Sequence, residues 1–365
     1  MPVDIGQIQD IINLTRATEL QKGSWVSLSA DLADYPLQSV LIPRVTKKSS
    51  YRYEWTVSTA NGPTTNGAEY SSVNKPVQAS VVSQSKRLGI DLCKIRAHTA
   101  FARDERDLQG GSEEELVDIV MLRESEKLNL PLASFLEHKL AGKPSSGSPS
   151  EQELYGLQYW FRADTTATDL ELNGGADPEN YPSGAADLTV AAVPRWAHAV
   201  AGYNKVSDDD LFDKLHEFRI RCNYYTPEGV NALNGGTPNR AILVQHPTFL
   251  EWARIQTAAN DDLRSDVGMW RNALNSMGTP VKWLPVISTP GSPETPTTYG
   301  LAYDLDLNTV KLLMHSDWNF DKEVMDKADT PGTIVVFREG YCQLACTDRE
   351  KNLVLTTSNP DLIVG

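Results

Sequence analysis

Residues 51 to 58 alternate between apolar and polar side chains, and this alternation constrains the fold more tightly than any other feature of the sequence. Successive side chains of a β-strand point to opposite sides, so the pattern predicts a strand with one aromatic face. A second alternating stretch follows from residue 77, after turn signals at Asn61-Gly62-Pro63 and Asn66-Gly67. We therefore predict a long β-hairpin over residues 49 to 86. Its apolar positions are Tyr51, Tyr53, Trp55 and Val57 on the first strand and Val77, Ala79 and Val81 on the returning strand, ahead of Leu88, Ile90 and Leu92.

The aromatic face of this hairpin needs a surface to cover it. A two-stranded ribbon is only marginally stable in water, and soluble monomers rarely expose a contiguous apolar patch of this kind. The body of the same chain can supply the cover, or a neighbouring chain can. The hairpin residues alone favour neither alternative.

The charge balance narrows the class of partner. The chain carries 34 Lys and Arg residues against 48 Asp and Glu residues, a net charge of −14 at pH 7 over 365 residues. This excess opposes tight, non-specific wrapping of nucleic acid, so we expect nearby DNA to be enclosed rather than gripped. No apolar run approaches the roughly 20 residues of a membrane helix, and the first residues lack an export signal. We therefore expect a cytoplasmic origin, no membrane partner and two or three folded units.

A long helix is predicted over residues 112 to 142, about 45 Å in length. Ser112 and Glu115 form a capping box at its start, and Gly142 marks its end. Pro131 removes a backbone donor from the interior and is expected to kink or split the helix. The side predicted to be apolar includes Leu128, Leu132, Phe135, Leu136 and Leu140.

The remaining segments predict an arm, a mixed unit and a β-rich tail, which together make an α+β fold. Residues 1 to 48 are expected to form an N-terminal arm with Ile8 and Ile12 on one helical face. Residues 161 to 299 predict an α/β unit: a helix after Ser207, a strand over Ala241 to Gln245, a helix opened by Pro247, a helical stripe from Leu263 to Met277 and a strand over Val281 to Ile287. The tail predicts a meander of four strands, at Thr309 to Met314, Thr333 to Phe337, Tyr341 to Cys346 and Asn352 to Thr357.

Catalytic and metal-binding patterns do not occur in this sequence. There is no nucleophile elbow, phosphate-binding loop, dinucleotide fingerprint or His-Glu-x-x-His zinc motif. Four cysteines are present, and the only close pair is Cys342 and Cys346, without a second pair at zinc-ligand spacing. We therefore expect buried free thiols, no cofactor, no metal, no catalytic residue and no enzymatic activity.

Five short segments carry a family resemblance. They are Glu137 to Pro144 (EHKLAGKP), Tyr155 to Phe161 (YGLQYWF), Tyr181-Pro182, Pro194-Arg195-Trp196 and Cys346 to Leu355 (CTDREKNLVL). In this order the segments resemble the major capsid proteins of tailed double-stranded-DNA bacteriophages, which have the HK-ninety-seven-like fold shared with encapsulins.

The resemblance implies that successive segments of the chain form different structural parts. It implies an N-terminal arm (1–48), an extended hairpin loop (49–86), a peripheral domain (87–160 and 300–365) with a spine helix at 112–142, and an axial domain (161–299). The terminal strands would return to the peripheral sheet. Contacts between subunits are then expected at Tyr51, Tyr53, Trp55, Val57, Val77, Ala79, Val81, Ile8 and Ile12.

The function implied is that of a virion capsid subunit. Copies would self-assemble as pentamers and hexamers into an icosahedral shell that encloses double-stranded DNA without sequence-specific binding. Scaffolding, portal or decoration proteins would be further partners. The alternative is an encapsulin-like nanocompartment shell, and a hydrolase with an unrecognised site is a third, weaker reading.

Overall fold

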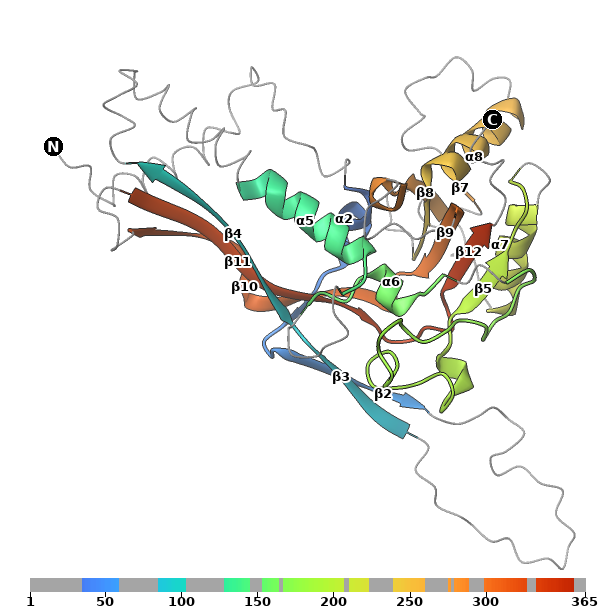
Figure 1. Cartoon of the computed structure of the whole chain (residues 1–365), viewed down its shortest axis with the longest axis horizontal. Helices are drawn as coiled ribbons and strands as arrows, with labels where there is room; N and C mark the ends of the chain where they lie inside the picture. The colour runs from blue at the N-terminus through green and yellow to red at the C-terminus, as the bar shows by residue number, and fades with distance from the viewer. Residues whose placement is uncertain are drawn as a thin grey trace, which may run out of the picture.

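Two β-sheets that share one hydrophobic core form the body of the protein, and a two-stranded ribbon extends from it (Figure 1). The computed structural model describes residues 35–58, 85–102, 128–144, 153–163, 167–206, 210–222, 239–259, 275–276, 279–288, 299–326 and 333–357. Several predicted contact residues lie outside these ranges, namely Ile8, Ile12, Val77, Ala79 and Val81.

The first sheet is long and narrow. Its two central strands pair antiparallel over most of their length, and one short edge strand runs parallel to its neighbour. Helix α5 (Leu130–Ala141) packs beside this sheet (Figure 1). The strand order is β1 (Thr46–Lys48), β10 (Val310–Asp326), β11 (Thr333–Cys346) and β4 (Cys93–Ala102).

The second sheet is mixed, with parallel pairs β5–β12 and β6–β8. Every residue of β5, β6 and β12 is buried, which explains why these segments read as continuous apolar runs rather than as alternating ones. The strand order is β5 (Ala199–Gly202), β12 (Leu353–Thr357), β9 (Tyr299–Asp306), β6 (Arg240–Val244), β8 (Thr279–Trp283) and β7 (Asn275–Ser276).

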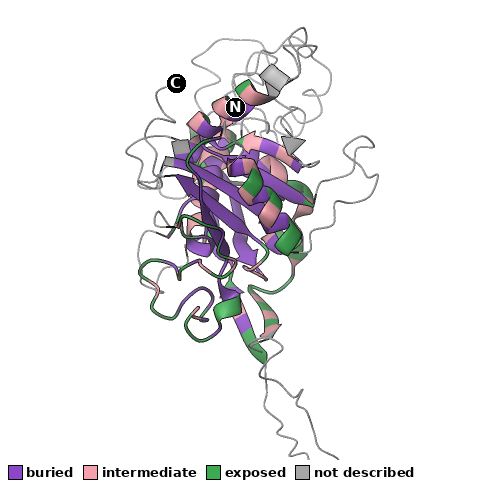
Figure 2. Ribbon diagram, turned by 90° about the vertical axis from the view of Figure 1, so that its right-hand side faces the viewer, coloured by how far each residue is buried: buried purple, intermediate pink, exposed green. Residues whose placement is uncertain are grey.

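The second sheet separates two hydrophobic clusters. One face carries Leu243, Tyr303 and Val354 and shares the main core with the first sheet. The opposite face carries Ile242 and Leu355 and packs against α7 (Asp210–Arg221) and α8 (His246–Ala259). Figure 2 shows these central strands as the buried layer of the molecule.

The ribbon consists of β2 (Arg52–Ser58) and β3 (Ser85–Asp91), which pair antiparallel. Tyr53 lies opposite Ile90, and Trp55 lies opposite Leu88. Residues 52–58 thus pair with a return strand as predicted, but this strand lies at 85–91 and extends beyond the predicted boundary at residue 86, and the predicted return positions 77–81 lie outside the described residues. Beyond Leu92 the chain continues directly into β4, so the ribbon is attached to the edge of the first sheet.

Helix α5 matches the C-terminal part of the predicted long helix, whose residues 112–127 lie outside the described ranges. The helix ends at Gly142 as predicted, where the Gly142 N–H donates to the His138 carbonyl. Pro131 is the second residue of α5, and a π-helical turn at residues 128–129 precedes it. The placement of Phe135 on the apolar side is wrong, because its ring is 47% exposed.

Helices α7 and α8 and strand β6 confirm three predicted elements of the middle segment. Two predictions there are wrong. The helical stripe does not extend to Met277, because Asn275 and Ser276 pair with β8 as a strand. The strand predicted up to Ile287 ends at Trp283, because Pro285 opens a short 3₁₀ helix, η7 (Pro285–Ser288).

The predicted four-strand meander of the tail is wrong. Strands β10 and β11 form a hairpin in the first sheet, whereas β12 joins the second sheet between β5 and β9. The return of all terminal strands to one peripheral sheet is therefore also wrong, because residues 353–357 pair with β5 at residues 199–202. The domain boundaries themselves stay a prediction.

The remaining elements of the described part of the chain are short helices. No helix in the described ranges is long and apolar enough to cross a membrane. The short helices are α2 (Pro36–Leu41), η2 (Ile42–Arg44), α6 (Leu157–Trp160) and η4 (Pro194–Trp196).

Candidate functional site

The apolar face of the ribbon is only partly covered by this chain. Tyr53, Trp55 and Val57 are half-buried and pack against the main core. The rings of Tyr53 and Trp55 stack with their centroids 5.5 Å apart. Tyr51, just ahead of β2, is 49% exposed. The core of the same chain therefore takes up part of the aromatic face, and Tyr51 is left accessible to an outside contact.

The opposite face of the ribbon is charged. Arg52 Nε lies 3.1 Å from Glu54 Oε1, and Arg52 Nη1 lies 3.6 Å from Asp91 Oδ1. Arg87 makes a further ion pair with Glu54. These pairs are largely exposed, and such pairs contribute about 0–1 kcal/mol each. They make this face of the ribbon a charged, solvated face, in contrast to the aromatic face on the other side.

An exposed group of aromatic rings lies beside the base of the ribbon. The Tyr51 ring stacks on His315 at 4.7 Å between centroids and meets the edge of Tyr341 at 4.9 Å. The Trp318 ring lies 6.3 Å from Tyr341 and is 37% exposed. Lys94 Nζ lies 5.9 Å from the Trp318 centroid and 5.7 Å from the Tyr341 centroid. We call these four rings and Lys94 the aromatic cluster.

A bulge in β10 presents the aromatic cluster. The pairing of β10 with β11 shifts between Met314 and Asn319 and again between Asn319 and Asp321. Phe320, between these shifts, has a φ of 68°, a conformation that costs a non-glycine residue about 1 kcal/mol or more. Its ring fits because Gly340 has no side chain; a Cβ there would lie 2.8 Å from Phe320 Cδ2. Such bulges bend a strand and redirect its side chains.

His315 anchors the cluster to the strand before the ribbon. The Asp317 N–H donates to His315 Nδ1 at 3.1 Å, and His315 Nε2–H donates to the Ser49 carbonyl at 3.1 Å. Together these bonds fix the orientation of the ring. The ring is 3% exposed, so it forms the floor on which the exposed Tyr51 lies.

The structure describes four of the predicted contact residues, and the others lie outside the described ranges. Tyr51, Tyr53, Trp55 and Val57 share one segment, as predicted. The sequence analysis missed the other members of the aromatic cluster, because a bulge between β10 and β11 is not visible in local alternation. The one local signal is that the apolar residues Leu312, Leu313 and Met314 are followed at once by the polar residues His315, Ser316 and Asp317.

A second feature is the buried guanidinium of Arg349, which joins the family-like segments. Arg349 is fully buried and donates to the carbonyls of Trp160 and Ala176, both at 2.9 Å. It also donates to His198 Nδ1 at 3.1 Å and lies over the Trp196 ring at 5.9 Å. Burial lowers the pKa of Arg349 to about 10.

His198 stays neutral in this arrangement. Burial first, and then the charge of Arg349, lowers the pKa of His198 to about 3. Because Nδ1 accepts from Arg349, Nε2 carries the proton and donates to the Arg162 carbonyl at 2.9 Å. The pair is therefore a fixed polar joint rather than an acid–base couple.

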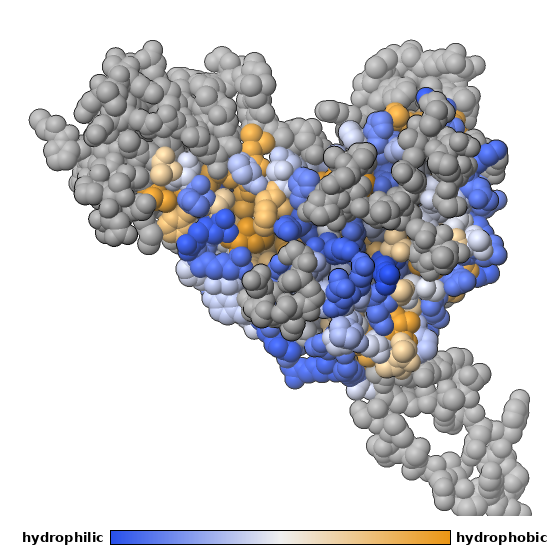
Figure 3. Space-filling view, in the orientation of Figure 1, coloured by the Kyte–Doolittle hydropathy of each residue, from blue (hydrophilic) through white to orange (hydrophobic). Residues whose placement is uncertain are grey.

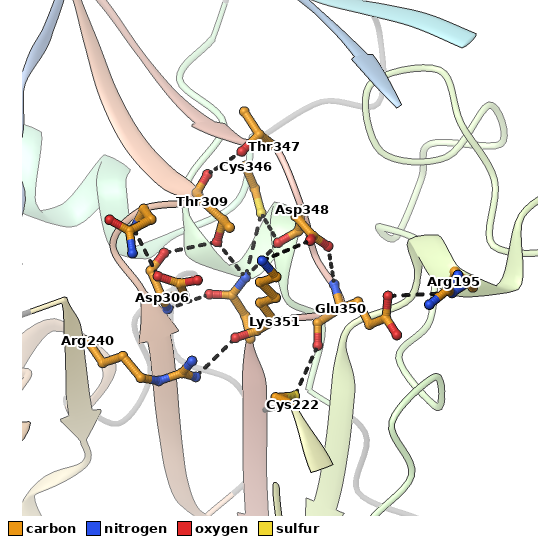
Figure 4. A network of polar contacts seen from close by, with 12 residues as sticks. Arg195, Cys222, Arg240, Asp306, Thr309, Cys346, Thr347, Asp348, Glu350 and Lys351 are labelled. Carbon is orange, nitrogen blue, oxygen red and sulfur yellow. Dashed lines mark hydrogen bonds and ion pairs between the residues drawn. The ribbon is translucent and has the colours of Figure 1, made fainter. Parts of the chain in front are cut away.

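The chain crosses from the first sheet to the second through a polar turn after Cys346 (Figure 4). Asn352 Nδ2 donates to Thr309 Oγ1 at 3.1 Å and to the Asp348 carbonyl at 2.9 Å. The Asp306 N–H in turn donates to Asn352 Oδ1 at 2.8 Å. These bonds satisfy the buried polar groups where the two sheets meet, and they explain why β12 leaves the hairpin of β10 and β11.

Thiols and carboxylates form no metal site in the described part of the chain. All four cysteines are free. Cys93, Cys342 and Cys346 are buried, as predicted, whereas Cys222 is partly exposed.

Comparison with known proteins identifies solved structures that share this architecture. No family model matches the chain, and no curated protein matches it. Among solved structures, the capsid asymmetric unit of cyanophage A-1(L) matches with a TM-score of 0.55 at 14% identity, over 94% of this chain and 98% of that chain. The capsid of a native GTA particle matches with a TM-score of 0.52 at 12% identity, over 92% and 94%. The chain has the phage-capsid fold.

A structure from Mycobacterium phage Ogopogo has the same phage-capsid fold, with a TM-score of 0.50 at 10% identity, over 94% of this chain and 99% of that chain. The predicted α+β phage-capsid fold is thus confirmed at the level of overall architecture. At such low identity the phage-capsid fold rests on arrangement rather than on shared residues. The Arg349 joint shows how the family-like segments serve that arrangement, because it contacts Trp160, Trp196 and His198 at once.

Proposed function

We propose that this protein is a structural subunit that self-assembles into an icosahedral capsid, which encloses the double-stranded DNA of a tailed phage. The observation that carries the proposal is the extent of the likeness to the cyanophage capsid, 94% of this chain and 98% of that one. Almost every part of one chain therefore has a counterpart in the other. We further propose that the protein has no enzymatic activity and resides in the virion.

The aromatic cluster supports an assembly role. Tyr51 and Trp318 are 49% and 37% exposed, and aromatic rings are enriched at the centres of protein interfaces. Lys94 adds a cation over two of the rings. A neighbouring copy would cover this surface and remove the apolar area from water, which is the main driving force of association.

The proposed parts of the subunit follow the capsid likeness. Residues 1–48 would be an N-terminal arm whose last residues are fixed to the body by the pairing of β1 with β10, and residues 49–86 would be an extended loop that reaches a neighbouring subunit. The helix at 112–142 would be the spine of the peripheral domain (87–160 and 300–365), and 161–299 the axial domain. Because β12 pairs with β5, we propose that the C-terminal segment contributes to both domains.

The net charge supports enclosure of DNA rather than tight binding. A chain with a charge of −14 repels the phosphate backbone at long range. Shell copies could then surround DNA without holding it too tightly for release. Other copies of the chain would be the principal partners, and scaffolding, portal or decoration proteins would be further ones.

Assembly of the purified full-length chain tests the proposal. We expect closed particles in negative-stain micrographs and a high-mass species in sedimentation. Replacing two exposed rings, Tyr51→Ser with Trp318→Ser, should abolish particles, because a truncated interface ring costs about 2 kcal/mol, or roughly thirtyfold per contact. Circular dichroism of the double variant should stay close to that of the wild type.

A matched variant separates ring burial from other effects. Tyr51→Phe with Trp318→Phe keeps an aromatic ring at both positions and should still form particles. If the wild-type chain stays monomeric at high concentration, the shell proposal is refuted. If the Ser variant assembles as well as the wild type, the aromatic cluster is not part of the interface.

A further inference from the structure

Two cysteines that are far apart in sequence face each other in the first sheet. Cys93 is the first residue of β4 and lies directly opposite Cys342 of β11. Residues opposite each other in an antiparallel pair have Cα atoms about 4.5 or 5.5 Å apart. Both values fall inside the range of about 4.4–6.8 Å that a disulfide requires. The backbone therefore already has the spacing of a bridge.

The side chains point toward each other. The Cys93 thiol donates to the Cys342 carbonyl at 3.0 Å. A hydrogen bond with the Cys93 side chain and burial together raise the pKa of Cys342. The two side chains are 2% and 1% exposed and belong to the main core. Both side chains lie in apolar surroundings.

The other cysteines are poorer partners. Cys342 and Cys346 are four residues apart on one strand, so their Cα atoms are separated by roughly 13 Å, far beyond the limit for a disulfide. The Cys346 thiol is engaged with the Asp348 carbonyl at 3.3 Å. The close pair in the sequence is thus not the pair that can bridge.

We propose that Cys93 and Cys342 form a disulfide when the protein leaves a reducing compartment. With oxidised glutathione as oxidant, the thiolate of one cysteine attacks a glutathione sulfur, forming a mixed disulfide and releasing one glutathione thiolate. The second cysteine loses its proton to water and attacks the protein sulfur of the mixed disulfide, releasing the second glutathione thiolate. Two protein thiols are oxidised, and one glutathione disulfide is reduced to two thiols.

The position suits a slow, stabilising modification. Cys93 and Cys342 are the final pair of the β4–β11 ladder, so opening this end breaks fewer contacts than opening the middle. The bridge would close a loop between residues 249 positions apart and fasten the base of the ribbon to a central strand. Closing a long loop restricts the unfolded chain strongly, so the bridge should raise the melting temperature.

Oxidation of the purified full-length chain tests this proposal. After incubation with oxidised glutathione a few degrees below the melting temperature, we expect the four free thiols to fall to two. Peptide mapping without reduction should find Cys93 joined to Cys342. The melting temperature should rise by roughly 5 °C or more and return to its original value with dithiothreitol.

Single variants identify the pair. Cys93→Ala and Cys342→Ala should show no oxidation-dependent rise, whereas Cys222→Ser should respond as the wild type does. Because an Ala variant can lower stability by itself, each variant is compared with its own reduced form. Four thiols that survive the treatment, or a mapped bridge between any other two cysteines, would overturn the proposal.

Discussion

Two glutamates show how neighbouring groups decide the charge state of a buried carboxylate. Burial raises the pKa of Glu137, although its carboxylate accepts from the Leu37 N–H at 2.8 Å and the Gln38 N–H at 3.1 Å. Burial also disfavours ionisation of Glu339, but hydrogen bonds from Lys94 and Arg96 outweigh it and lower the pKa. The pKa of a glutamate carboxyl is thus raised at Glu137 on α5 and lowered at Glu339 on β11.

These opposite shifts predict opposite pH profiles. Because the folded-state pKa of Glu137 is raised above the usual 4.5, its stabilising effect is full below pH 4.5 and is lost as pH rises through the folded pKa. The melting-temperature advantage of wild type over Glu137→Gln should therefore shrink by a few degrees between pH about 4 and 7. Differential scanning fluorimetry across this range measures it.

The matched variant Glu339→Gln should behave in the reverse way. Its folded-state pKa is lowered, so the contribution of Glu339 is present above the unfolded pKa and is lost as pH falls through the folded pKa. The advantage of wild type over Glu339→Gln should grow as pH rises. Parallel profiles for the two variants would contradict this account.

At the scale of elements, the junction of α5 and α6 depends on close approach of two backbone segments. The Gln158 N–H donates to the Gly142 carbonyl at 3.2 Å, just past the end of α5. A Cβ at Gly156 would overlap the carbonyl oxygens of Lys139 and Gly142. Backbone atoms at a helix end cannot move aside as a flexible side chain can, so only glycine fits at this position.

We therefore expect Gly156→Ala to destabilise the fold by about 3 kcal/mol or more. The control is Gly89→Ala on β3, where the added Cβ would meet Arg52 Nε at 2.9 Å. The Arg52 side chain is more than half exposed and can move, so this variant should cost under about 1 kcal/mol. Urea unfolding of both variants measures the difference, and equal losses would show that the α5–α6 contact tolerates displacement.

Elements were predictable from sequence where the signal is local. Alternation around Trp55 identified the ribbon, and the apolar run at Ala241 identified β6. Pairings between distant segments were not predictable, because nothing in the apolar sequence of β12 indicates that it pairs with β5 rather than with β11. Glu137 was equally hidden, since a charged residue near a helix end is usually solvated.

Most of the candidate site was beyond sequence reasoning for the same reason. Tyr51 was identified because it continues the alternation of β2. Tyr341 contacts Tyr51, and Trp318 contacts Tyr341, only because of a bulge and a pairing between β10 and β11. A contact surface that is assembled from four separate segments has no local sequence signature.

At the scale of the molecule, the second sheet and α7 are tied together by a buried charged group. Asp304 on β9 lies 3.0 Å from Arg219 on α7 and 3.0 Å from Arg240 on β6, and all three side chains are at most 3% exposed. Burial alone would raise the pKa of Asp304, but the two arginines lower it. Breaking such a buried group costs about 3–5 kcal/mol. The second sheet and α7 are therefore joined by an ion pair network inside the core rather than by surface ion pairs.

In the proposed assembly, apolar attraction between copies would act against the repulsion of their negative charges. Each copy carries −14, and raising the salt concentration from about 10 mM to about 100 mM shortens the screening length from about 30 Å to about 10 Å. If apolar contact through Tyr51 and Trp318 drives association, added salt removes the opposing repulsion and leaves the attraction in place. The subunit concentration at which particles form should then fall roughly tenfold, as measured by light scattering.

The Tyr51→Ser, Trp318→Ser chain should stay unassembled at both salt concentrations. Particles that dissociate as salt rises would show instead that ion pairs between copies hold the shell.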